Sequence, residues 1–257
     1  MNVRWVNQLR LYALALALAS LACAGGAAGP GAGAPAPAKN GPPPGPDAVR
    51  TIDLYVLPYY ESAKAPGKRP TVRVGKDFDA LLSSNRPEDV LAARDRLEAD
   101  PDYITPMTMT VLAVRLYDAG YRDDAVFWFY AARNRYHTLE GVLELAAPET
   151  AGVRDAMHAF YELAGPVING YAYCDLAKLK GVRARSLAWV EQHPYAALFW
   201  DRLPARPGDR GGHLKETVAA LRGQLREELE FLGREENVAR LRELRAKNGV
   251  DARYCWQ

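Results

Sequence analysis

The chain has 257 residues, of which 49% are hydrophobic and 25% charged, and this excludes a wholly disordered, collagen-like or coiled-coil protein. Its formal net charge is +2, and Arg4 and Arg10 are the only charged residues among the first 24. Without that segment the chain is neutral, which excludes the basic surface typical of nucleic-acid binding and a strong attraction to anionic lipids.

Residues 1–23 are typical of an export signal. Two arginines precede an apolar run, Leu11 to Leu21, that is shorter than the ~20 residues needed to span a bilayer. The cleavage region has two interpretations. Ala22-Cys23-Ala24 fits a small-x-small site that releases a free protein, whereas the residues up to Cys23 resemble a bacterial lipobox, in which Cys23 is lipidated. We therefore expect an exported protein, periplasmic or an outer-membrane lipoprotein, and favour the lipoprotein.

The next segment, residues 24–50, is dominated by Gly, Ala and Pro as far as Pro46. Such a composition cannot bury a core, so we expect a disordered tether. One folded domain is then expected over residues 51–257. Its first part, residues 51–75, contains two β-type runs, and Pro58 restricts the first run to a sheet edge or an extended arm. We expect this arm to pack against a helical body.

From Lys76 onward the sequence predicts an all-α domain of about ten helices. Asn85 is expected to cap the second helix, Thr105 the third and Asp175 a later one, and Gly120 and Gly249 are expected to end helices. Gly165-Pro166 is expected to break or kink the chain. The expected helices cover residues 77–82, 86–99, 105–119, 123–136, 138–143, 149–164, 175–192, 195–200, 213–232 and a last stretch ending near 249, with the longest internal loop at 203–212.

One predicted helix pair resembles a known repeat. Small residues are placed where two helices touch, large apolar residues lie between them, and a glycine falls at the turn. Over about residues 106–136 this pattern resembles one tetratricopeptide unit, and it is carried by Leu112, Ala113, Leu116, Tyr117, Gly120, Ala125, Phe129 and Ala132. The resemblance implies a helical hairpin and a role in protein interaction.

No enzymatic motif is present. The sequence lacks a Gly-x-Ser-x-Gly elbow, a phosphate-binding loop, a dinucleotide fingerprint and a His-Glu-x-x-His zinc motif. The histidines are His137, His158, His193 and His213, too far apart for helical metal pairs, and no Cys-x-x-Cys occurs. We therefore predict a non-enzymatic protein with no cofactor and no metal, while a site assembled from distant residues stays open.

Two cysteines remain after Cys23 is removed or lipidated. Cys174 and Cys255 form an even pair in an oxidising compartment, which predicts one disulfide. The alternative is two buried free thiols.

The aromatic run Phe127-Trp128-Phe129-Tyr130 covers every side of a helix. This pattern predicts a buried central helix. The alternative is a partner-binding groove in which Tyr130 lies with Tyr121 or Tyr136, because exposed aromatics are typical binding anchors. Asn169 lies inside an apolar run, where it either bridges helices by hydrogen bonding or lines a polar binding pocket.

Together these features favour a non-enzymatic binding protein of the bacterial cell envelope. Its architecture resembles the exported immunity or accessory proteins that accompany secreted toxic effectors. The alternatives are an envelope hydrolase with a non-standard active site and an envelope assembly factor or chaperone. We expect a protein partner of unknown identity, no nucleic acid, and membrane contact only through a lipid anchor.

Overall fold

The computed structural model describes residues 76–147, 150–201 and 203–255. Within these ranges the chain is helical, with no β-strand and one isolated β-bridge between Leu143 and Ala205. The predicted all-α class is therefore confirmed. The predicted signal, tether and extended arm lie outside the described residues.

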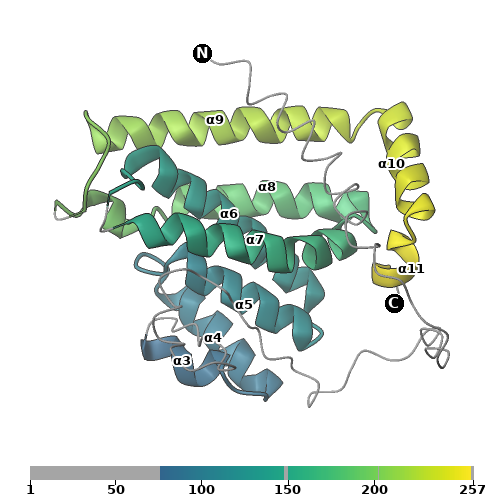
Figure 1. Ribbon diagram of the computed structural model, residues 1–257, viewed down its shortest axis with the longest axis horizontal. Helices are drawn as coiled ribbons and strands as arrows, with labels where there is room; N and C mark the ends of the chain where they lie inside the picture. The colour runs from purple at the N-terminus through teal and green to yellow at the C-terminus, as the bar shows by residue number, and fades with distance from the viewer. Residues whose placement is uncertain (1–75, 148–149, 202, 256–257) are drawn as a thin grey trace, which may run out of the picture.

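The described part contains nine α-helices and one 3-10 helix, shown in Figure 1. Helices α9 and α3–α5 lie on opposite sides of the molecule, with α6, α7 and α8 between them. The elements are α3 (Lys76–Leu82), α4 (Pro87–Ala99), α5 (Pro106–Asp118), α6 (Arg122–Val142), α7 (Ala151–Ala172), α8 (Leu176–Gln192), η4 (Ala196–Phe199), α9 (Arg210–Phe231), α10 (Glu235–Lys247) and α11 (Val250–Tyr254).

Helix α6 is the centre of the fold, because it contacts α5, α7, α8 and α9. The side chains of Trp128, Phe129 and Tyr130 are only 1–2% exposed. Phe127 is half-buried. The aromatic run therefore lies on a central helix, as predicted, because the neighbouring helices cover most of α6.

Two helices are longer than predicted. Helix α6 continues to Val142 without a break at residue 136, because Leu139 and Val142 extend its buried face. Helix α7 runs through Pro166, so the predicted break at Gly165-Pro166 is wrong. Pro166 and Glu162 are both exposed, so water can bind the Glu162 carbonyl that loses its helical N–H partner.

The start of α4 also differs from the prediction. Its N-cap is Arg86, not Asn85, and no side chain caps it. Instead the carboxylate of Asp89 accepts hydrogen bonds from Ser84 and Arg86 and so ties the first turn to the preceding residues. The side-chain caps expected at Thr105 and Asp175 are present.

Helices α5 and α6 form the most extensive helix pair of the described chain. Gly120 joins them with a φ of +91°, a left-handed conformation that favours glycine. Ala113, Ala125 and Ala132 are fully buried. The resemblance to a tetratricopeptide unit stays a prediction, since such repeats are defined by several copies.

Candidate protein-binding site

Three exposed aromatic side chains come from two loops at one end of the bundle. Tyr103, between α4 and α5, is 57% exposed, while Phe199 and Trp200, at the end of η4, are 46% and 37% exposed. The ring centroids of Tyr103 and Trp200 are 5.9 Å apart. The two loops are joined by the backbone N–H of Ala196, which donates to the carbonyl of Asp102 at 2.8 Å. We call Tyr103, Phe199 and Trp200 the aromatic patch.

A buried arginine holds the two loops together from inside the molecule. Arg135 on α6 is fully buried. Its Nη1 donates to the carbonyls of Pro101 at 2.7 Å and Ile104 at 2.8 Å, and its Nη2 donates to the carbonyl of His193 at 2.6 Å. Only arginine offers several donors in one rigid plane, so a single side chain can fix both loops.

The charge of Arg135 is stabilised without an ion pair in the described chain. Its guanidinium lies 4.8 Å from the ring centroid of Trp189 and 5.7 Å from that of Tyr195, close enough for cation–π attraction. Burial lowers the pKa of Arg135 to about 10, so the side chain stays protonated at neutral pH. Arg135 therefore remains a donor for all three carbonyls under physiological conditions.

A second arginine fixes η4 from the other side. Arg210 donates through Nη1 to the carbonyl of Leu198 at 2.6 Å and through Nη2 to that of Leu203 at 2.7 Å. The sequence placed Arg210 inside a long loop, whereas it is the first residue of α9. Leu198 and Ala197 are buried beneath the patch, so the exposed rings stand on a packed base.

The predicted partner-binding residues do not form a common groove. Tyr130 and Tyr136 are each only 2% exposed, so they belong to the core and the predicted groove is wrong for both. Tyr121 is 37% exposed at the start of α6, about 22 Å along the helix from Tyr136 at 1.5 Å per residue. Asn169 on α7 is half-buried and accepts a hydrogen bond from the Tyr130 hydroxyl at 2.8 Å, which is the bridging alternative.

Sequence reasoning singled out the turn at 195–200 as helical but missed the exposure of its aromatic side chains. The signal is present in the sequence, since Phe199 and Trp200 stand next to polar residues and beyond the end of an amphipathic helix. The sequence does not show where Tyr103 lies. Tyr103 reaches the patch because the loop between α4 and α5 lies beside η4.

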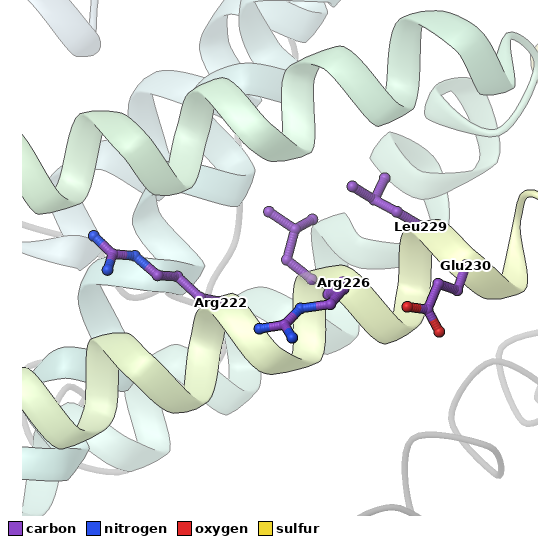
Figure 2. Close-up of a pocket in the computed structure, with 5 residues that line it drawn as sticks. Arg222, Arg226, Leu229 and Glu230 are labelled. Carbon is purple, nitrogen blue, oxygen red and sulfur yellow. The ribbon is translucent and has the colours of Figure 1, made fainter.

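Helix α9 carries a shallow surface of a different kind. Figure 2 shows Arg222, Arg226, Leu229 and Glu230 along the same helix, with Leu225 between them. Arg222 is already paired with Glu191 through two hydrogen bonds of 2.7 and 2.6 Å. All five described residues come from one helix, so this surface offers no convergent set of groups for chemistry.

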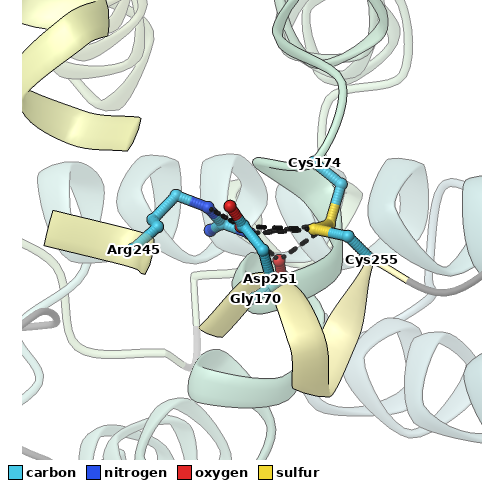
Figure 3. Close-up of a disulfide and its surroundings, with 5 residues drawn as sticks. All are labelled: Gly170, Cys174, Arg245, Asp251 and Cys255. Carbon is cyan, nitrogen blue, oxygen red and sulfur yellow. Dashed lines mark hydrogen bonds and ion pairs between the residues drawn. A yellow bond between two sulfur atoms is a disulfide. The ribbon is translucent and has the colours of Figure 1, made fainter. Parts of the chain in front are cut away.

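The structure joins Cys174 and Cys255 in a disulfide, with Cα atoms 5.4 Å apart, and the predicted pairing is present. Figure 3 shows Arg245 beside it. The Arg245 Nη2 donates to the carbonyl of Gly170 at 2.9 Å and lies 3.2 Å from the Cys255 sulfur, while its Nε donates to Asp251 at 2.7 Å. This junction attaches α10 and α11 to the end of α7 and has a structural role.

The described ranges contain no candidate metal site. No group of three His, Cys, Asp or Glu side chains there is arranged to hold a metal ion. In the same ranges, no helix is both long and apolar enough to cross a bilayer.

The described residues form an all-α protein with exposed aromatic side chains on loops that Arg135 and Arg210 hold in place by hydrogen bonds. The chain belongs to the same family as an uncharacterised protein of Haemophilus influenzae. The two are 36% identical over 210 residues, which cover 82% of this chain and 81% of the relative. No family model matches the chain. No solved structure matches it.

Proposed function

We propose that this protein is a non-enzymatic binding protein of the bacterial cell envelope, and that it recognises a protein partner through the aromatic patch. The observation that carries the proposal is the exposure of Tyr103, Phe199 and Trp200 on loops that two arginines hold in place. Aromatic side chains dominate the energetic centres of protein interfaces, because they bury a large area at low entropic cost.

Preorganisation supports a binding role for this surface rather than incidental exposure. Ordering a loop on binding costs free energy, and a loop that is already ordered avoids that cost. The loops of the patch are fixed by buried hydrogen bonds to Arg135 and half-buried ones to Arg210, as a binding surface of fixed shape requires.

The charges beside the patch indicate the chemistry of the partner surface. Asp102 precedes Tyr103, Asp201 follows Trp200, and both acidic residues are exposed. Carboxylates at the rim of an interface favour basic residues on the partner and speed association at low salt. The expected partner surface is apolar at its centre with lysine or arginine around it.

The envelope location in this proposal rests on the predicted export signal at residues 1–23 and the predicted tether at residues 24–50. An immunity or accessory role beside a secreted effector is the form of this function that we favour. In that role the tether would place the patch away from the membrane surface, where an exported effector is encountered.

The test compares two phenylalanines of equal exposure. Phe199 in the patch and Phe231 at the end of α9 are both 46% exposed. Wild type, Phe199→Ser and Phe231→Ser are each expressed in the envelope and purified by affinity with bound proteins identified. A partner enriched by wild type and Phe231→Ser should be lost with Phe199→Ser.

The partner found in this way is then purified and titrated against the same three proteins. We expect Phe199→Ser to weaken binding by about tenfold or more, and Phe231→Ser to leave it unchanged. Equal binding by all three proteins would show that the aromatic patch is not the interface.

A further inference from the structure

The disulfide at the C-terminal junction is open to solvent on one side. Cys174 is exposed, whereas Cys255, just after α11, is half-buried. Cys174 stands between the last residue of α7 and the first residue of α8, so no helix covers it on its own chain. Thiol–disulfide exchange requires that a thiol reach one of the two sulfurs, and Cys174 is the more accessible residue.

A buried guanidinium contacts both sulfurs from inside the molecule (Figure 3). The Arg245 Nη2 lies 3.2 Å from the Cys255 sulfur and 3.5 Å from the Cys174 sulfur. The same guanidinium is fixed by hydrogen bonds to the carbonyl of Gly170, at 2.9 Å, and to the carboxylate of Asp251, at 2.7 Å. It is therefore held in place before any reaction, with Cys255 as the nearer sulfur.

This guanidinium favours a cleaved disulfide over an intact one. A sulfur in a disulfide is uncharged and accepts hydrogen bonds weakly, whereas a thiolate is an anion that accepts a charge-assisted hydrogen bond. A neighbouring cation lowers the pKa of a cysteine thiol, and a thiol of lower pKa leaves a disulfide faster. Cys255 is therefore the favoured leaving group, because Arg245 lies closest to its sulfur.

One negative charge lies close enough to oppose this effect. An oxygen of the Asp251 carboxylate is 3.4 Å from the Cys255 sulfur. The Asp251 side chain is 47% exposed, whereas that of Arg245 is only 10% exposed. Water therefore screens the carboxylate more than the guanidinium, so the attraction of a thiolate to Arg245 exceeds its repulsion by Asp251.

We propose that the disulfide between Cys174 and Cys255, besides joining helices, is a site of thiol–disulfide exchange at which an external dithiol reduces the bond. One thiolate of the dithiol attacks the Cys174 sulfur and forms a mixed disulfide. The bond between the two cysteines breaks, and its electron pair goes to the Cys255 sulfur, which leaves as a thiolate beside Arg245.

The second thiol of the dithiol completes the reaction. It loses its proton and attacks the neighbouring sulfur of its own molecule in the mixed disulfide, and Cys174 leaves and takes up a proton. Two electrons pass to this protein, and the dithiol becomes a disulfide. A dithiol suits this step because its second thiol is already held beside the bond that it must attack. Reduction removes the covalent link between α7 and the C-terminal helices.

The rate of reduction tests the role of Arg245. Wild type, Arg245→Met and Arg242→Met are treated with dithiothreitol at neutral pH, and the free thiols are followed by alkylation and mass spectrometry. Arg242 is the matched control, because it is an exposed arginine one turn earlier in α10. We expect Arg245→Met to be reduced about fivefold more slowly or less readily still, and Arg242→Met at the wild-type rate. Arg245→Lys should recover part of the rate, since it keeps a cation.

A loss of packing would have the opposite effect. Arg245→Met also removes the donors to Gly170 and Asp251, and a looser junction would expose the bond and speed its reduction. Slower reduction therefore reports the stabilisation of the leaving thiolate. Equal or faster reduction of Arg245→Met would overturn the proposal.

The attacked sulfur is identified in wild type, so this test does not depend on the folding of a variant. The folded protein is mixed with 2-mercaptoethanol, the reaction is stopped early with acid, and the adduct is located by peptide mapping. We expect the adduct on Cys174 and a free thiol at Cys255. The proposal is also overturned if the adduct lies chiefly on Cys255, or if dithiothreitol reduces the bond only under denaturing conditions.

Discussion

At the scale of single residues, two buried arginines donate hydrogen bonds to backbone carbonyls. The sequence pattern alone favours solvent exposure for arginine side chains. Arg135 is fully buried and Arg245 is 9% exposed, yet each donates to backbone carbonyls far away in the chain. A carbonyl buried without a donor costs free energy, so each arginine stabilises the loop or helix end that it reaches. Arg135 thereby couples the packing of α6 to the shape of the aromatic patch.

Substituting Arg135 tests this coupling. Arg135→Met leaves the carbonyls of Pro101, Ile104 and His193 without their donor, and we expect a loss of about 3 kcal/mol in the free energy of unfolding. Arg135→Lys should recover only part of this, because one ammonium cannot reproduce the planar fork. Urea denaturation gives the values, with exposed Arg226→Gln as the control. A change within about 0.5 kcal/mol for Arg135→Met would contradict the assigned role.

A second residue-scale prediction concerns acid. Burial lowers the pKa of His137 in the folded protein, so below the pKa of the unfolded state the unfolded chain binds the additional proton. Stability is then full above the unfolded histidine pKa of about 6.5 and falls as the pH drops through it. His137→Gln should flatten this part of the pH profile of the melting temperature. An unchanged slope in the variant would assign the acid sensitivity to other groups.

At the scale of helices, the close approach of α11 to α7 depends on one glycine. A Cβ added at Gly170 would lie 2.5 Å from Cδ2 of the Tyr254 ring, far closer than van der Waals contact. The ring of Tyr254 can therefore rest on α7 only because Gly170 has no side chain. Arg245 binds the carbonyl of the same glycine, so two contacts of the C-terminal helices share one position.

Gly170→Ala should loosen this contact although alanine favours a helix. Gly181→Ala in α8 is the matched control, because nothing lies within 4 Å of its added Cβ, and there we expect a gain of up to about 1 kcal/mol. For Gly170→Ala we expect a loss of about 1–3 kcal/mol and faster amide exchange in α11. A gain in stability at both positions would mean that Tyr254 moves aside without cost.

At the scale of the whole molecule, the C-terminal helices close the structure across its end. Figure 1 shows α10 turning away from the end of α9 and running toward α11. Within the described chain α10 contacts chiefly α11, and α11 contacts α7. The disulfide between Cys174 and Cys255 spans a sequence separation of 81 residues and encloses α8, α9, α10 and α11 in one covalent loop.

Removing the disulfide should weaken this closure more than it weakens the bundle. The variant Cys174→Ser/Cys255→Ser is expected to lose about 4–5 kcal/mol in the free energy of unfolding, which is the chain-entropy estimate for a loop of this length. Hydrogen exchange should increase first in α10 and α11 and much less in α6. Non-reducing peptide mapping of protein from the envelope checks the bond itself. Two alkylatable thiols, or unchanged exchange in α10 and α11, would contradict this prediction.

Features that depend on local chemistry could be predicted from the sequence alone. Thr105 and Asp175 cap helices as predicted, because a side-chain oxygen at an N-cap needs only the next turn. Gly120 follows the end of α5 as predicted, because glycine readily adopts the positive φ that the turn into α6 requires. The burial of α6 followed from aromatic residues on every side, and the cysteine pairing followed from there being two candidates.

Tertiary structure alone decided which polar and aromatic groups are buried and which are exposed. Periodicity could not distinguish Tyr136, in the core, from Tyr103, on the surface, because exposure depends on which helices cover a side chain. It could not assign Arg135 to carbonyls on two loops, since those contacts form only after the helices pack. It also could not show that Glu162 and Pro166 lie on the exposed side of α7, where water can replace the missing helical hydrogen bond. The aromatic patch is built from two loops that are distant in sequence, and for that physical reason the sequence could not locate it.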